Sequence, residues 1–164
     1  MNSLIKISWD SNLPIYEISQ SELQKKGIYC LFLDVDGTLV NRNTNELPKA
    51  VKNWIIESKK LFSLYLISNN PSKKLIAKIA KELNLRYKYN ASKPRKKEML
   101  NAINEVNYEV KNIAIIGDRI FTDIIVGNRC NIKTILVKRL QRDGLPIKFN
   151  LTLTIEKLIS FFIK

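Results

Sequence analysis

Residues 28–39 read IYCLFLDVDGTL, an apolar run that ends in two acids, a glycine and a threonine. The apolar part has the length and composition of a buried β-strand. Asp34 and Asp36 lie two residues apart, so they point the same way in extended backbone, and Gly37 lets the chain turn sharply after them. The stretch therefore predicts a strand whose carboxyl end presents an acidic pocket suited to a hard divalent cation.

Strand-like runs alternate with helical patterns along the rest of the chain. Further strands are expected at 64–68, 113–117 and 134–137, with a weaker one at 86–89. Helices are expected to begin at Pro48, after the cap 69–71, and at Pro94, and a last one to span 123–129. The alternation predicts an α/β fold with one parallel sheet and helices on both of its faces.

A chain of 164 residues is expected to form one domain. Residues 1–27 are interpreted as a peripheral N-terminal segment of helices or coil, ahead of the main domain at 28–164. The tail from Thr154 carries Ile155, Leu158, Ile159 and Phe162, and we expect it to cover the core. The N-terminus lacks the apolar region of a signal peptide, which favours the cytoplasm or an organelle stroma.

Composition excludes several kinds of catalysis. The chain has no histidine, which rules out Ser-His and Cys-His nucleophiles and histidine-ligated zinc. Its two cysteines, Cys30 and Cys130, provide no zinc or disulfide framework and are expected to be buried free thiols.

Positive charge is concentrated in one part of the sequence. The chain carries 28 Lys and Arg against 15 Asp and Glu, a net charge of +13. A basic block at 73–97 includes one acid, Glu82, and these basic residues: Lys73, Lys74, Lys78, Lys81, Arg86, Lys88, Lys93, Arg95, Lys96 and Lys97. Such a block attracts nucleic acid, an anionic membrane or phosphorylated substrates, and it can equally be a solvated face.

Further polar residues follow the other expected strands. Ser68 ends the second strand, Asp118 ends the strand at 113–117, and Asp123 follows five residues later. Lys93 precedes a helix and can reach the same crevice, where ligands bind in open parallel sheets. Carboxylates that gather Mg²⁺ beside a hydroxyl and a lysine predict a phosphoryl-transfer site.

Four segments, in order, resemble the motifs of the haloacid dehalogenase superfamily of phosphatases: 34–39, 67–70, 93–94 and 117–123. The resemblance implies a Rossmann-like fold of that type, with Asp34 as nucleophile and Asp36 as general acid and base. It implies that Thr38, Ser68 and Asn69 bind the substrate phosphate together with Lys93, which also balances charge. It implies Mg²⁺ as cofactor, held by Asp34, Asp118 and the backbone carbonyl of Asp36. Asp123 would also ligate the metal, or it would orient Lys93 and a metal-bound water.

A narrower resemblance, over 68–72, 93–95 and 117–129, is to the YqeG-type phosphatases of subclass IIIA. These are similar to phosphatidylglycerophosphate phosphatases, which implies a role in phospholipid biosynthesis. Only short connections follow Leu39 and Ser68, so no cap domain is expected over the site.

An open site and the basic block favour a bulky anionic substrate, and we expect phosphatidylglycerophosphate at the inner face of a membrane. Three alternatives stay open: a phosphatase of nucleic-acid ends, a phosphatase of a small soluble ester, and a non-catalytic anion-binding module. We rank the nucleic-acid phosphatase lower than the lipid phosphatase, because the basic block lacks the interleaved aromatic residues that stack on single-stranded bases.

Overall fold

The computed structural model describes residues 4–42, 44 and 46–140. Six parallel strands form one sheet in the order β1-β6-β5-β2-β3-β4. The strands are β1 (Trp9–Asp10), β2 (Cys30–Leu33), β3 (Ser63–Ile67), β4 (Arg86–Lys88), β5 (Ile113–Gly117) and β6 (Lys133–Leu136). This confirms the α/β class and the parallel sheet expected from the sequence.

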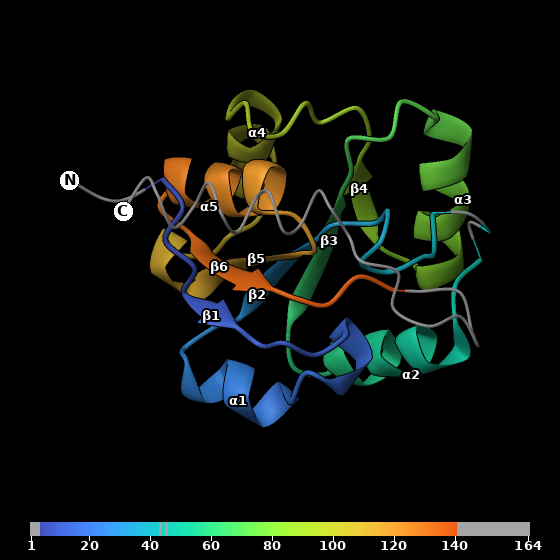
Figure 1. Ribbon diagram of the computed structural model, residues 1–164, viewed down its shortest axis with the longest axis horizontal. Coiled ribbons are helices and arrows are strands. Elements are labelled where there is room, and N and C mark those ends of the chain that lie inside the picture. The colour runs from blue at the N-terminus through green and yellow to red at the C-terminus, as the bar shows by residue number, and fades with distance from the viewer. Residues whose placement is uncertain (1–3, 43, 45, 141–164) are drawn as a thin grey trace.

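Helices cover both faces of the sheet, as Figure 1 shows. Their bounds are α1 (Gln20–Lys25), α2 (Lys49–Ser58), α3 (Lys73–Leu83), α4 (Lys97–Glu105) and α5 (Ile125–Arg129), with the short turns η1 (Ile15–Glu17) and η2 (Val110–Asn112) and the π-helical η3 (Ile120–Ile124). The apolar side chains of α1, α2 and α3 pack on one face, and those of α4 and α5 pack on the other.

The alternation of side chains along β2 divides its residues between the two layers. Leu31 and Leu33 join the cluster under α2 and α3, whereas Cys30 and Phe32 join the cluster under α4. All four residues of β2 are buried, because the strand is paired on both edges and covered on both faces. Both cysteines are buried free thiols, as the sequence predicts.

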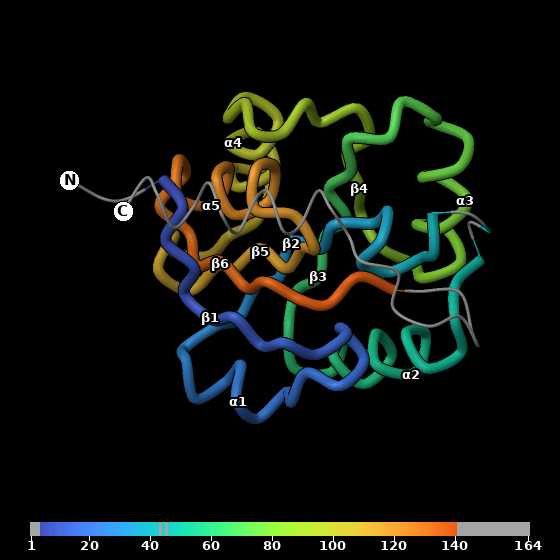
Figure 2. Tube along the Cα trace, viewed as in Figure 1, coloured from blue at the N-terminus to red at the C-terminus, as the bar shows by residue number. Residues whose placement is uncertain are grey.

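The N-terminal segment adds an edge strand that the sequence pattern did not indicate. β1 pairs with β6 in parallel, with Trp9 opposite Ile135, and Figure 2 shows this segment beside β6. After β1, Ile15, Ile18 and Leu23 are buried in the core. The helix expected in residues 1–27 is present as α1, but the segment is part of the sheet and core as well as of the periphery.

Two helices start later than their prolines suggest. Pro48 takes the N-cap position of α2, and α4 begins at Lys97, three residues after Pro94. The helix expected after 69–71 is α3, capped by the hydroxyl of Ser72. The tail from Thr154 lies outside the described residues.

The connections over the carboxyl edge of the sheet are short. Between β2 and α2, the described residues of 34–48 form turns and a single bridge between Asp36 and Val40. One helix, α3, joins β3 to β4. The described part of the chain therefore has no cap domain, as the sequence predicts. It also contains no helix long and apolar enough to span a bilayer.

Candidate active site

The strand order creates the place where the site forms. From β2 the chain moves outward to β3 and β4, then returns to the other side of β2 with β5 and β6. The connections that leave the carboxyl ends of β2 and β5 therefore diverge to opposite sides, and this opens a crevice between them. The predicted site residues after β2, β3 and β5 all lie at this edge.

Asp34 stands at the centre of this crevice, directly after β2. Its backbone N–H donates to the carbonyl of Ile116 at 2.9 Å, which continues the pairing of β2 with β5. Its carboxylate is buried, and the hydroxyl of Thr38 donates to Oδ2 at 3.2 Å. The turn after β2 thus fixes the carboxylate from its own following residues.

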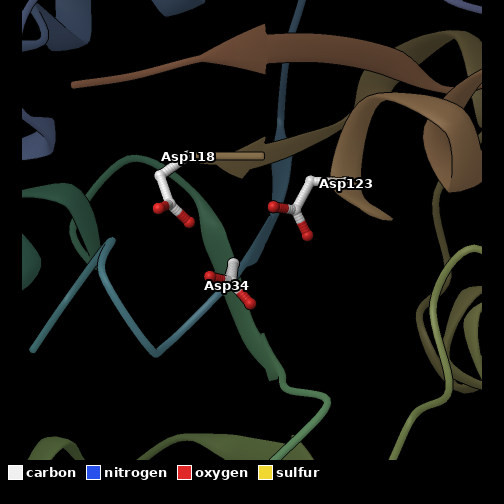
Figure 3. A group of neighbouring side chains, drawn as sticks. All are labelled: Asp34, Asp118 and Asp123. Carbon is white, nitrogen blue, oxygen red and sulfur yellow. The ribbon is translucent and has the colours of Figure 1, made fainter. Parts of the chain in front are cut away.

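Asp118 and Asp123 approach Asp34 from β5 and η3. Both are fully buried, and each of the three residues offers an oxygen that lies within 4.8 Å of the others'. Figure 3 shows the three carboxylates gathered around one space. Asp123 is oriented by the backbone N–H of Arg119, which donates to its Oδ2 at 3.2 Å. We call Asp34, Asp118 and Asp123 the acidic cluster.

Lys93 inserts its ammonium group into the acidic cluster. Its Nζ donates to Asp34 Oδ1 and Asp123 Oδ1, each at 2.6 Å, and to the carbonyl of Ile67 at 2.9 Å. All three of its donors are therefore used, as a buried ammonium requires. Asn69 holds the backbone of Lys93 from both sides, because its amide accepts from Lys93 N at 2.7 Å and donates to Lys93 O at 2.9 Å.

Burial and mutual repulsion set the ionisation of these groups. Burial raises the pKa of Asp123 to about 7, with Lys93 opposing the rise and Asp34 adding to it. Burial and the charge of Asp34 also raise the pKa of Asp118, against the effect of Arg139. Burial alone would lower the pKa of Lys93, but Asp123 and Asp34 outweigh it and raise that pKa. Lys93 is thus a permanent cation in the cluster.

Asp36 lies beside the acidic cluster and has different partners. Ser68 Oγ donates to its Oδ2 at 3.1 Å, and Asn70 Nδ2 donates to its Oδ1 at 3.1 Å. Its backbone carbonyl, which the resemblance assigns to the metal, accepts from Arg42 Nε at 3.1 Å. Asp36 is partly exposed, unlike the three acids of the acidic cluster.

The structure brings together every residue that the sequence predicts for the site. The hydroxyls of Thr38 and Ser68 contact the carboxylates of Asp34 and Asp36, respectively, and Asn69 contacts the backbone of Lys93. Their binding of a substrate phosphate stays a prediction.

Three contributors were not predicted as site residues: Asn70, Arg42 and Arg139. Asn70 was expected in a helix cap and lies in the motif segment 67–70, but it was given no role in the site, yet it donates to Asp36. Arg139 follows β6, and its Nε donates to Asp118 Oδ2. Neither arginine lies in one of the four motif segments. The one sequence signal that could have indicated a site residue is the position of Arg139 after an expected strand.

The donor set fits a divalent metal ion. Three buried carboxylates outnumber the two cations that contact them, Lys93 and Arg139. In addition, Oδ1 of Asp118 is buried without a hydrogen-bond partner among the described residues. A buried oxygen left unpaired costs about 1–3 kcal/mol, which a bound cation would recover. Carboxylate oxygens are the ligands that Mg²⁺ and similar hard cations take.

Known sequences resemble this chain in the part that carries the site. The pattern of a family described as HAD-hydrolase-like matches residues 90–143, which include Lys93, Asp118 and Asp123. The chain is also 28% identical over 138 residues to "Probable phosphatase YqeG" of Bacillus subtilis, covering 83% of this chain and 80% of that protein. The chain is therefore similar to phosphatases of the haloacid dehalogenase type.

Solved structures share the fold of this chain at low sequence identity. An uncharacterized protein from Listeria monocytogenes aligns with a TM-score of 0.57 and 17% identity, over 83% of this chain and 98% of that one. A predicted HAD-like family hydrolase from Porphyromonas gingivalis aligns with a TM-score of 0.57 and 12% identity, over 80% and 98% of the two chains. Each alignment covers nearly the whole of the compared protein. Other proteins therefore share this fold over almost their entire length.

Proposed function

We propose that this phosphatase hydrolyses phosphate monoesters through a covalent phosphate on Asp34, with Mg²⁺ held by the acidic cluster. The observation that carries the proposal is the position of Lys93 Nζ, 2.6 Å from both Asp34 Oδ1 and Asp123 Oδ1. This contact holds the carboxylate of Asp34 in place at the strand end, beside a cation, as a nucleophilic carboxylate requires.

In the first step, an oxygen of Asp34 attacks the phosphorus and forms a P–O bond, while the bond from phosphorus to the ester oxygen breaks. Asp36 would give that leaving oxygen its proton, a role supported by its position two residues after Asp34 and by its partial exposure. The products of this step are the free alcohol and the aspartyl phosphate.

In the second step, water attacks the phosphorus of the aspartyl phosphate and gives a proton to Asp36. The P–O bond to Asp34 breaks, inorganic phosphate leaves, and both carboxylates return to their starting states. Asp34, Asp118 and Asp123 would hold Mg²⁺, with the carbonyl of Asp36 as a further ligand, and the ion would offset the negative charge of the phosphate oxygens.

The proposed substrate is phosphatidylglycerophosphate at an anionic membrane surface on the cytoplasmic or stromal side. An uncapped crevice supports it, because a lipid head group can enter while its acyl chains stay in the bilayer. The basic block supports it as well. Lys73 and Lys74 begin α3, and Arg95, Lys96 and Lys97 lie at the start of α4; all five are exposed. Each basic residue near an anionic bilayer contributes about 1 kcal/mol to binding.

The test is Mg²⁺-dependent phosphate release by the wild type, Asp34→Asn and a control, Asp10→Asn. Asp10 is an exposed acid of β1, so its variant makes the same chemical change away from the crevice. Substrates are phosphatidylglycerophosphate in anionic vesicles, a 3′-phosphorylated oligonucleotide and a small aryl phosphate.

We expect wild-type turnover to be fastest on the vesicles, and Asp34→Asn to lower turnover at least about a thousandfold with the fold intact. Asp10→Asn should match the wild type. Retained turnover in Asp34→Asn would contradict the mechanism. A preference for the oligonucleotide or for the aryl phosphate would replace the lipid as substrate, and no release from any of the three would favour a non-catalytic anion-binding module.

A further inference from the structure

Arg139 is held in place by the backbone on both sides of it. The N–H of Lys138 donates to the carbonyl of Leu13, and the N–H of Leu140 donates to the carbonyl of Gly37, both at 2.8 Å. Gly37 belongs to the turn that follows Asp34 and Asp36. The segment after β6 is thereby attached to the turn at the centre of the crevice, and Arg139 is the residue between the two attachments.

The guanidinium of Arg139 contacts one oxygen of the acidic cluster. Its Nε donates to Oδ2 of Asp118, whose side chain is fully buried, whereas the Arg139 side chain is 22% exposed. The other oxygen, Oδ1, is the buried atom without a hydrogen-bond partner in the described part of the chain. The two oxygens of one carboxylate are therefore in different states, one held and one available.

This asymmetry has a consequence for a bound cation. A carboxylate at the end of a single χ2 torsion can rotate and present either oxygen. A hydrogen bond to Oδ2 removes that freedom and leaves Oδ1 for a ligand. Partners that orient metal-binding side chains in this way commonly change metal affinity by about 10–100-fold when they are removed.

We propose that Arg139 is a positioning residue for the metal site, which orients Asp118 so that Oδ1 binds the divalent cation. The inference rests on the metal site of the proposed function, and it adds a residue from outside the four motif segments. The backbone hydrogen bond from Leu140 to Gly37 also connects the segment after β6 to the crevice.

The positive charge of Arg139 has the opposite effect from its hydrogen bond. A guanidinium beside the acidic cluster repels a second cation, so if charge were its main contribution, removing Arg139 would tighten metal binding. If orientation is the main contribution, removing it weakens metal binding. The sign of the change therefore separates the two roles.

The experiment is a calorimetric titration of the metal-free, full-length chain with Mg²⁺, without substrate. The variants are Arg139→Gln, Arg139→Lys and Lys138→Gln. Lys138 is the exposed neighbour, and its variant loses the same charge one residue away. Arg139→Lys keeps the charge but not the shape of the guanidinium donor, and it serves as the variant that retains an ionic partner for Asp118 should Arg139→Gln not fold.

We expect Arg139→Gln to weaken Mg²⁺ binding by about 10–100-fold, Arg139→Lys to weaken it less, and Lys138→Gln to change it by less than about threefold. A role in stability alone would lower the melting temperature of the metal-free protein and leave the Mg²⁺ affinity of the folded variant unchanged, which would overturn the proposal.

Unchanged or tighter Mg²⁺ binding by Arg139→Gln would likewise overturn it. That result leaves the proposed function standing if the wild type binds Mg²⁺ and turns over substrate. A wild type that binds no Mg²⁺ would remove the metal site itself and this inference with it. Turnover retained by Asp34→Asn would overturn the covalent mechanism but not the role of Arg139 in metal binding.

Discussion

Asp123 is buried beside Lys93 and near the charge of Asp34. Its burial and these two neighbours set the pKa of its carboxyl group. Burial raises the pKa of Asp123 from its ordinary value of 3.8 to about 7, although Lys93 acts in the other direction. The folded protein therefore binds this proton more tightly than the unfolded chain does. Between the two pKa values the folded state carries an extra proton, so its stability falls as the pH rises.

This predicts an unusual pH profile for the metal-free protein. Its melting temperature should fall between about pH 4 and about pH 7, because in that range folded Asp123 keeps a proton that the unfolded chain has lost, and the fall should end where folded Asp123 ionises. The slope should be smaller in Asp123→Asn, where only Asp118 still contributes a raised pKa, and it should reverse when Mg²⁺ is added, since the cation favours the ionised carboxylates. The chain has no histidine, which leaves few other groups to titrate there. Equal slopes in the wild type and in Asp123→Asn would contradict the assignment.

At the residue scale, the sequence predicted the groups whose spacing is local. Asp34, Asp36 and Thr38 lie in one turn, and Asp118 and Asp123 lie in another, so a short segment contains the information. Arg139 could not be found in this way. Its partner Asp118 is 21 residues away, and their contact depends on how β6 and the following segment lie against Gly37.

The passage from β5 through η3 to α5 is the element on which the acidic cluster depends most closely. Gly117 ends β5, and a Cβ atom there would lie 2.4 Å from the carboxylate of Asp123. Gly127 in α5 is equally crowded, since its Cβ would lie 2.5 Å from Thr134 Cγ2, but it faces the core rather than the crevice. Two glycines of the same passage thus meet different neighbours.

We expect Gly117→Ala to displace Asp123 and so to abolish the rise in melting temperature that Mg²⁺ produces. Gly127→Ala is the matched control. It should destabilise the protein by about 1–3 kcal/mol through overpacking and keep the Mg²⁺-dependent rise. The measurement is the melting temperature of both variants with and without Mg²⁺. A normal Mg²⁺ response in Gly117→Ala would show that η3 moves to accommodate the methyl group.

At the element scale, apolar runs and their spacing predicted the strands and helices that are buried on one or two faces. The first and last residues of these elements were harder to predict. Helix α4 begins only at Lys97, because residues 93–96 form the turn that carries Lys93 into the acidic cluster. β1 was missed because it is only two residues long, Trp9 and Asp10, which is too short for any periodicity. Its existence depends on β6, far away in the sequence.

At the scale of the whole molecule, positive charge and the open crevice lie at the same edge. α3 starts at the carboxyl edge of the sheet and runs back along it, so Lys73 and Lys74 lie near the crevice. Lys78 and Lys81 are exposed on the same helix, about one to two turns further away. The helix therefore provides two pairs of lysines that differ in their distance from the site.

The membrane proposal predicts that these pairs differ in effect. Lys73→Gln with Lys74→Gln should weaken binding to anionic vesicles by about 2 kcal/mol, roughly 30-fold, and leave hydrolysis of a small aryl phosphate unchanged. Lys78→Gln with Lys81→Gln should weaken vesicle binding less. Co-sedimentation with vesicles and an aryl phosphate assay provide the two measurements. Equal losses for both pairs would mean that binding follows net charge and that the crevice does not face the bilayer.

The order of the strands also determines when the site can form while the ribosome makes the chain. Asp34 emerges early, but β2 acquires its second neighbour only when β5 has been made, and Asp118 and Asp123 follow that strand. A nascent chain that stops before β5 carries Asp34 and Lys93 without the other two acids of the cluster. With the metal site that we propose, a chain that includes β5 and η3 would bind the ion, and a chain that stops before β5 would not.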